Sequence, residues 1–208
     1  ISASVVKALL DIDLKHAMFD RHSSALHDPA CVQAAIVAFE IAMARHWQGI
    51  GLRPDYVLGH SVGEYAAAVI AGYLDHEQAI ALVVERGMRV AECAERYPNS
   101  GMLAVFIHAG EVASLPCLQA LELAAINGER HRVFSGVEAD IRRAIAALEK
   151  ANIAYKKLSV PCAMHSKVLD SMLEGYAQCA AKLEPQPPQI PLISTLTGKV
   201  LDAALLKD

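Results

Sequence analysis

The spacing of apolar residues predicts a long helix in the first quarter of the chain. Large apolar side chains recur every three or four positions at Val32, Ile36, Phe39, Met43 and Trp47. This is the period of one helix face, and we expect that face to be buried. Glycines follow the stretch, and glycine after the last periodic residue is typical of a helix end.

A second long helix is predicted from Asp75 to about Arg96. Asp75 precedes the periodic stretch and Gln78 lies three residues later, which is the spacing of a capping box. Between the two long helices, the apolar run 56–58 predicts a short strand. The alanine-rich segment 64–71 predicts a helix directly after it.

The middle of the chain changes to alternating strands and helices. We predict strands over 102–107, 121–126, 131–135 and 153–160, with a turn at Asn127-Gly128, and helices over 111–119 and 137–150. This order, β-α-β-β-α-β, is typical of the ferredoxin-like split βαβ arrangement. A further helix over 165–183, an extended proline-rich connector and a strand over 190–195 complete the pattern.

The order of elements predicts an α/β protein with two subdomains. Residues 1–100 and 161–208 are expected to form an α/β-hydrolase-like large subdomain. Residues 101–160 are expected to form a ferredoxin-like small subdomain inserted into it.

Composition narrows the class of protein. The 208 residues are 54% hydrophobic and 20% charged, which is typical of a globular chain. A net charge of −4 without a block of lysine and arginine argues against a nucleic-acid partner. No apolar run approaches the roughly 18 residues of a membrane-spanning helix. The chain starts without methionine and without a signal peptide, and we expect it to be a piece of a longer protein.

The cysteines point to a reducing compartment. The five are widely spaced and form no C-x-x-C pair, so neither a zinc site nor a disulfide framework is expected. We therefore expect a cytoplasmic protein without a metal.

The pentapeptide Gly59-His60-Ser61-Val62-Gly63 is the strongest candidate for chemistry. Strand, Gly-x-Ser-x-Gly, helix is the context of a nucleophile elbow, in which the serine adopts a strained backbone conformation at a helix N-terminus. The glycines avoid side chains that would collide with the strand and the helix. A chance match in a small-residue turn is the alternative interpretation.

A serine nucleophile needs a base, and the candidates are the nine histidines. His165 stands out because it directly follows the last strand of the predicted small subdomain. A lone histidine at the start of a helix is also commonly structural. Position alone therefore leaves its role open.

Taken together, these motifs resemble the malonyl-CoA:acyl-carrier-protein transacylase family, and especially the acyltransferase domains of polyketide synthases. The segment 59–64 matches the GHSxGE motif of that family, and Arg86 lies where the family has an arginine that binds a substrate carboxylate. Further matches follow in the same order along the chain, at 100–105, 125–128, 134–136, 162–166 and 197–198.

The resemblance implies an acyltransferase that needs no bound cofactor. It implies that Ser61 takes an acyl group, with malonyl favoured, from acyl-CoA and passes it to the phosphopantetheine thiol of an acyl carrier protein in polyketide or fatty acid biosynthesis. It further implies that His165 is the base and that Arg86 holds the malonyl carboxylate. The N–H of Val62 is a candidate oxyanion donor. Neighbouring ketosynthase or linker domains are the other expected partners.

Selectivity for the acyl group is expected to depend on the pocket. His60 and Met164 are candidate substrate-binding residues. In the family, Val or Ile at the position of Val62 tends to accompany malonyl, and HAFH is typical of malonyl where YASH is typical of methylmalonyl. The corresponding segment here, Cys162 to His165, matches neither. Bulky Met164 favours malonyl, although methionine is deformable and leaves larger extenders open.

Two other functions stay open, and two departures from the family support the first of them. No segment matches the family's N-terminal strand and Gly-Gln-Gly loop, and the chain stops before a later strand of the family. Both ends of the catalytic unit are therefore expected to be absent, which allows a non-catalytic docking piece. A serine hydrolase is the other alternative, because it shares the elbow but has no need of Arg86.

Overall fold

The computed structural model describes residues 2–201 as two compact units. The first contains residues up to Met88 together with those from Tyr176 onward, and the second is Arg89–Gly175. Two helices, α5 (His76–Arg96) and α9 (Asp170–Ala180), belong in part to both units. The predicted α/β class is confirmed. The second unit contains the whole of the predicted small subdomain, 101–160.

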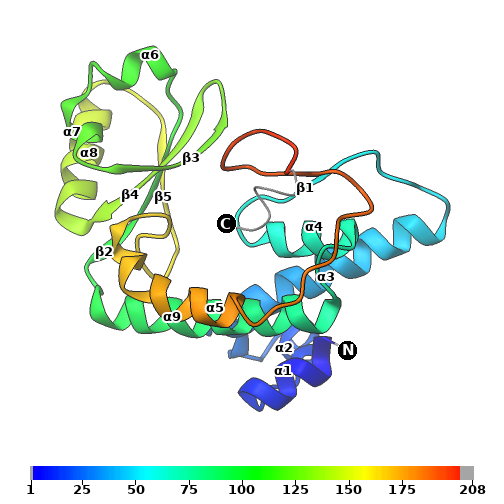
Figure 1. Cartoon of the computed structure of the whole chain (residues 1–208). Coiled ribbons are helices and arrows are strands. Elements are labelled where there is room, and N and C mark those ends of the chain that lie inside the picture. The colour runs from blue at the N-terminus through cyan, green and yellow to red at the C-terminus, as the bar shows by residue number, and fades with distance from the viewer. Residues whose placement is uncertain (1, 202–208) are drawn as a thin grey trace. The chain divides into compact units, whose positions relative to one another are not determined.

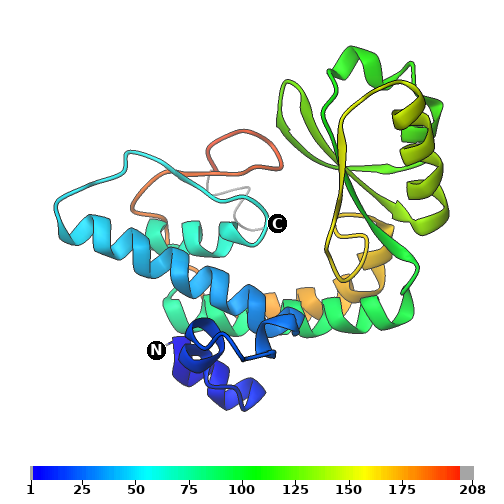
Figure 2. The same ribbon diagram turned by 180° about the vertical axis from the view of Figure 1, so that it is seen from behind.

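The first unit consists mainly of helices together with a short parallel sheet (Figure 1). Strand β1 (Val57–Leu58) pairs in parallel with β6 (Leu192–Ile193). Figure 2 shows the long helix α3 beside α4, in agreement with the contacts between them. The remaining elements of this unit are α1 (Ser2–Leu10), α2 (Leu14–Phe19), η1 (Ala25–His27), α3 (Pro29–Gly49) and α4 (Gly63–Ala71).

Helix α3 forms where it was predicted, but the prediction of its buried face is wrong. Phe39 and Trp47 are 54% and 47% exposed. The buried face instead carries small and β-branched residues, among them Ala30, Val37 and Ile41. The helix is apolar almost all round, and small side chains let neighbouring helices approach closely. The large apolar residues therefore do not mark the face that packs.

Helix α5 begins as predicted. Gln78 N–H donates to the Asp75 carboxylate over 2.7 Å, and Asp75 N–H donates to the Gln78 amide over 3.2 Å. This reciprocal pair is a capping box, and it fixes the start of the helix that later carries Arg86.

The second unit contains an antiparallel sheet with strand order β3-β4-β2-β5. This is the order of a ferredoxin-like fold, as the sequence pattern predicted. Helix α8 packs on one face of the sheet, and the core between them contains Leu103, Phe134 and Leu148. The elements are β2 (Ser100–Val105), α6 (Ala109–Val112), α7 (Pro116–Gln119), β3 (Glu122–Gly128), β4 (His131–Val137), α8 (Glu138–Lys150), β5 (Tyr155–Leu158) and η2 (Lys167–Leu169).

The turn between β3 and β4 lies two residues later than predicted. Gly128 pairs with His131, so the turn residues are Glu129 and Arg130. The strand register shifts between Ile126 and Gly128. Asn127 is therefore taken up in an irregularity of the strand rather than in the turn.

Among the described residues, none of the helices is long and apolar enough to cross a membrane. All five cysteines are free thiols.

Candidate active site

The candidate nucleophile Ser61 lies in a tight connection between β1 and α4. Its φ is +54°, a left-handed conformation that a residue with a side chain adopts only at a cost in free energy. Gly63 N–H donates to the His60 carbonyl over 3.0 Å, and Glu64 N–H donates to the Ser61 carbonyl over 3.1 Å. The turn therefore leads directly into the first turn of α4, as a nucleophile elbow requires.

Gly59 allows this turn to close. A Cβ added at Gly59 would lie 2.1 Å from the carbonyl carbon and oxygen of Gly63. Both atoms belong to the backbone, so no side-chain movement relieves the clash. A Cβ at Gly63 would lie 3.4 Å from the Glu40 carboxylate oxygens, which is ordinary contact. The predicted collision is thus severe at the first glycine and absent at the second.

Glu40 places a carboxylate against the elbow. Its Oε2 atom is enclosed and has no hydrogen-bond partner among residues 2–201. Burial raises the pKa of this carboxyl, because removing a charge from water disfavours the ionised form. A Cβ added at Gly63 would touch this carboxyl group, so the acid lies next to the first residue of α4.

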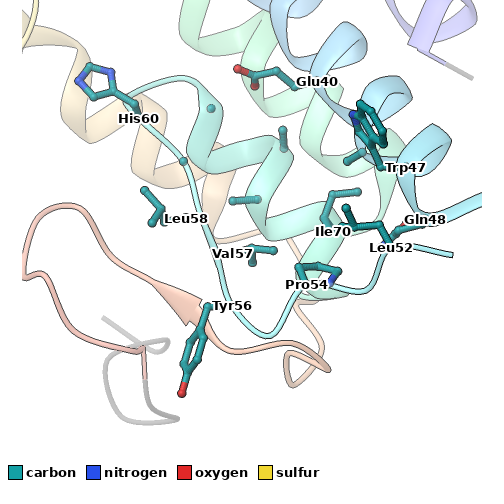
Figure 3. Close-up of a pocket in the computed structure, with 15 residues that line it drawn as sticks. Glu40, Trp47, Gln48, Leu52, Pro54, Tyr56, Val57, Leu58, His60 and Ile70 are labelled. Carbon is teal, nitrogen blue, oxygen red and sulfur yellow. The ribbon is translucent and has the colours of Figure 1, made fainter. Parts of the chain in front are cut away.

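A groove of about 690 Å³ runs along β1 and reaches the elbow. Figure 3 shows Trp47, Leu52 and Pro54 grouped at one end of it, with His60 at the other. Gly59 and Gly63 also line it. The predicted substrate-binding residue His60 is thus an exposed side chain where the groove meets the elbow.

The end of the GHSxGE segment holds another loop in place. The Glu64 carboxylate accepts hydrogen bonds from the backbone N–H of Thr195, over 3.2 Å, and from the Thr195 hydroxyl. Thr195 follows β6, the strand that pairs with β1. One side chain therefore links the nucleophile helix to the turn that contains Thr197 and Gly198.

His165, in the second unit, also has a left-handed backbone, with φ of +56°. Its loop is held by side chains from the sheet. The Ser135 hydroxyl donates to the Met164 carbonyl, Ala163 N–H donates to the Ser100 hydroxyl over 3.1 Å, and Lys167 N–H donates to the Glu122 carboxylate over 3.2 Å. The helix predicted from 165 begins only at α9, after the short η2 turn.

Positive φ, taken together with position relative to the helices, singles out the two candidate catalytic residues. Among residues 2–201, four residues other than glycine have a positive φ. Asp11 directly follows α1 and Asn152 is the second residue after α8, and such a conformation is common after a helix. Ser61 and His165 lie instead in turns that precede helical segments, and strain of that kind concentrates at functional sites.

The side chain of Met164 packs on the sheet face opposite α8. It lies with Leu158 and Val160 against the buried residues Met102 and Ala104. Neighbouring Cys162 is fully buried, and burial raises the pKa of its thiol to about 11. Cys162 is therefore a protonated structural residue at neutral pH.

Arg86 extends from α5 in the first unit. Its Nη1 donates to the amide oxygen of Gln33 on α3. Val62, the N-cap of α4, has φ of −59° and ψ of −24°, so its N–H lies at a helix N-terminus. Ser61, Val62, His60 and Arg86 are thus in one unit, and Met164 and His165 are in the other.

Sequence reasoning missed the side chains that hold these residues. Ser100 and Ser135 lie inside segments that matched the family, yet only the matches and not their hydroxyls were interpreted. The sequence alone assigned no role to Gln33. Tyr65 and Tyr176, whose hydroxyls are hydrogen bonded to each other, gave no signal in the sequence because they lie 111 residues apart.

Comparison with known proteins assigns the family. The sequence model of the family described as "Acyl transferase domain" matches residues 2–206. The chain belongs to the acyl transferase domain family. The resemblance drawn from the motifs is therefore confirmed.

Curated relatives of this acyltransferase domain are polyketide synthases. It is 39% identical over 175 residues to the non-reducing polyketide synthase aoiG of Aspergillus oryzae, an alignment that covers 83% of this chain and 8% of the relative. It is 36% identical over 195 residues to the phenolphthiocerol synthesis polyketide synthase Pks15/1 of Mycobacterium marinum, covering 93% and 9%. The chain thus spans less than a tenth of the length of these relatives.

Solved structures of acyltransferases have the same fold. The acyl transferase domain of SpnD, in complex with 2-(pent-4-yn-1-yl)malonyl, superposes with a TM-score of 0.88 at 32% identity, covering 100% of this chain and 48% of that one. The malonyl CoA-acyl carrier protein transacylase of Coxiella burnetii gives a TM-score of 0.87 at 26% identity, covering 99% and 69%. The fold of the family is therefore present throughout the described residues.

Proposed function

We propose that this acyltransferase domain transfers a malonyl-type extender unit from coenzyme A to an acyl carrier protein, with Ser61 as the nucleophile. The observation that carries the proposal is the left-handed backbone of Ser61 between β1 and α4, in a chain of the acyl transferase family. No step of this chemistry calls for a metal ion or a bound cofactor, because serine and imidazole supply the nucleophile and the proton transfers.

In the first half-reaction, Ser61 is acylated. The His165 imidazole takes the hydroxyl proton of Ser61 as its oxygen attacks the thioester carbonyl carbon. A tetrahedral oxyanion forms, with the N–H of Val62 as one donor to it. The carbon–sulfur bond then breaks, the acyl group stays on the serine as an ester, and coenzyme A leaves as a thiol with the proton from the imidazolium.

In the second half-reaction, the carrier protein removes the acyl group. The thiol of its phosphopantetheine arm gives its proton to His165, and its sulfur attacks the acyl-serine carbonyl. The ester carbon–oxygen bond breaks, and Ser61 recovers its proton from the imidazolium. The cycle is ping-pong, because coenzyme A leaves before the second thiol reacts.

Arg86 is proposed to select acyl groups that carry a free carboxylate. A guanidinium binds a carboxylate through two parallel hydrogen bonds, and its charge is fixed at every physiological pH. His60, at the groove, and Met164 are proposed to shape the space around the rest of the acyl group. The bulk of Met164 favours malonyl over branched extenders.

The proposed setting is a multidomain polyketide synthase in the cytoplasm. The relatives named above are such synthases, and the five free thiols suit a reducing compartment. The carrier protein and adjoining ketosynthase or linker domains are the proposed partners.

The test is intact-protein mass spectrometry of the complete polypeptide that carries this sequence. After brief mixing with malonyl-CoA, methylmalonyl-CoA or acetyl-CoA, we expect a malonyl adduct that Ser61→Ala abolishes. Arg86→Ala should slow malonyl loading by roughly a hundredfold, because it removes two charge-assisted hydrogen bonds, and should slow acetyl loading far less. An adduct that persists in Ser61→Ala contradicts the assignment of the nucleophile. Adduct loss to water at the rate of transfer to a carrier protein would favour a hydrolase instead.

A further inference from the structure

Three other helices bring polar side chains near Arg86 of α5. Gln33 comes from α3, Tyr65 from α4 and Tyr176 from α9. Arg86 donates to the Gln33 amide oxygen, and the two tyrosine hydroxyls are hydrogen bonded to each other. The positive charge of Arg86 acts on the pKa of both phenols, so the four side chains form one electrostatic cluster.

Gln33 is a neutral partner for a charged group. It is only 7% exposed and lies on the buried face of α3 among apolar residues. A buried amide requires hydrogen-bond partners, and Arg86 supplies one. A neutral acceptor orients a guanidinium without cancelling its charge, whereas a carboxylate in the same place would compete with a bound acid.

The two tyrosines are neutral partners as well. Burial raises the pKa of both hydroxyls, and this effect exceeds the lowering by Arg86. Both phenols therefore stay protonated at physiological pH. When one hydroxyl donates to the other, the proton of the accepting hydroxyl is still available to a further acceptor.

Close packing of α3 on α5 fixes the distance between Gln33 and Arg86. A Cβ at Gly87, the residue after Arg86, would lie 2.2 Å from the Cα of Ala30. Ala30 lies one helical turn before Gln33 on α3. The absence of a side chain at Gly87 thus lets α3 bring the amide up to the guanidinium.

We propose that Gln33, Tyr65 and Tyr176 are positioning residues for Arg86, and that this network sets the preference for acyl groups with a free carboxylate. The inference rests on the proposed function, in which Arg86 holds that carboxylate. A bidentate contact requires the guanidinium plane in one orientation. A free arginine side chain samples many orientations. The network removes that freedom and leaves the positive charge for the substrate.

Gln33→Glu tests the proposal directly, because it keeps the shape of the side chain and adds a carboxylate beside Arg86. We expect the ratio of malonyl to acetyl loading on Ser61, each measured as kcat/KM in the complete polypeptide, to fall by about tenfold or more. The loss should appear mainly in KM for malonyl-CoA. Gln78→Glu is the matched control, because it adds the same charge two turns earlier on α5 in a capping box that accepts either residue.

Tyr176→Phe keeps the proposal falsifiable if Gln33→Glu fails to fold. It removes one oxygen atom, and we expect the malonyl to acetyl ratio to fall a few-fold. Folded variants whose ratios stay within twofold of the unmutated protein, or a Gln78→Glu variant that shifts the ratio equally, would overturn the inference. Failure of the proposed function is a separate outcome, because the unmutated protein would then form no acyl-Ser61 at all.

Discussion

The connection around Ser61 and the loop around His165 each hold a candidate catalytic residue at nearly the same positive φ, but by different means. Their φ values are +54° and +56°. The elbow is closed by backbone packed on backbone, with Gly59 against Gly63. The histidine loop is held by side chains, with Ser135, Ser100 and Glu122 bonded to its backbone.

A strained backbone can thus be held either by local backbone packing or by hydrogen bonds from distant side chains. In the elbow, the strained residue and the backbone atoms that confine it lie within five consecutive residues, so the pentapeptide alone is enough to form the turn. In the loop, the restraining side chains come from three strands and lie 29 to 63 residues before the backbone groups that they bind. We expect the elbow to fail abruptly when its packing is changed and the loop to loosen step by step.

The largest effect is expected from Gly59→Ala. The added methyl group meets immovable backbone at 2.1 Å, so the elbow opens or the chain fails to fold. We expect a loss of more than about 3 kcal/mol in the free energy of unfolding, measured by urea denaturation. Gly110→Ala is the control, because a Cβ there meets nothing within 4 Å. A Gly59→Ala variant as stable as this control would show that the elbow is not closed by packing.

A smaller effect is expected from Ser135→Ala. Ser135 is fully buried, and its loss leaves the Met164 carbonyl without the hydroxyl that donates to it. We expect this to lower the free energy of unfolding by about 1–3 kcal/mol. The rate of Ser61 acylation should fall as well, because His165 is the next residue. Ser114→Ala removes a similar hydroxyl-to-carbonyl bond in an exposed turn and should change stability by less than about 0.5 kcal/mol. Unchanged acylation in a folded Ser135→Ala variant would argue against a positioning effect.

The smallest effect is expected when glycine and alanine variants are compared at Ser61 and at His165. At a left-handed residue, glycine should be more stable than alanine by about 1 kcal/mol. We therefore expect Ser61→Gly and His165→Gly to melt at higher temperatures than Ser61→Ala and His165→Ala. At Arg142, exposed in α8, the order should reverse, because alanine is the better helix former. Alanine variants that are more stable than the glycine variants at all three positions would rule out strain at the two site residues.

The parts of the fold that sequence predicted well depend on short-range physics. The capping box of α5 needs only Asp75 and Gln78, and the elbow needs only the pentapeptide. Strand order in the second unit followed from the order of elements, because few topologies are compatible with it. These features required no knowledge of distant residues.

The parts that sequence missed depend on which segments meet. Close contacts with neighbouring helices, such as that of Ala30 with Gly87, decide which face of α3 is buried. The spacing of apolar residues along α3 carries no information about these neighbours. The anchors of the histidine loop are ordinary serines and a glutamate, whose roles arise only when three strands assemble. The cluster around Arg86 likewise needs four helices, and no local pattern encodes it.

The contact between Gly87 and Ala30 has a consequence for engineering. Since no side chain separates the two helices at that point, α3 and α5 behave as one part in any exchange between related domains. A graft that replaces one helix while keeping the other would bring unmatched surfaces together at this close contact. Recombination points for chimeric domains are therefore best placed before Asp28, which caps α3, and after Arg96, at the end of α5.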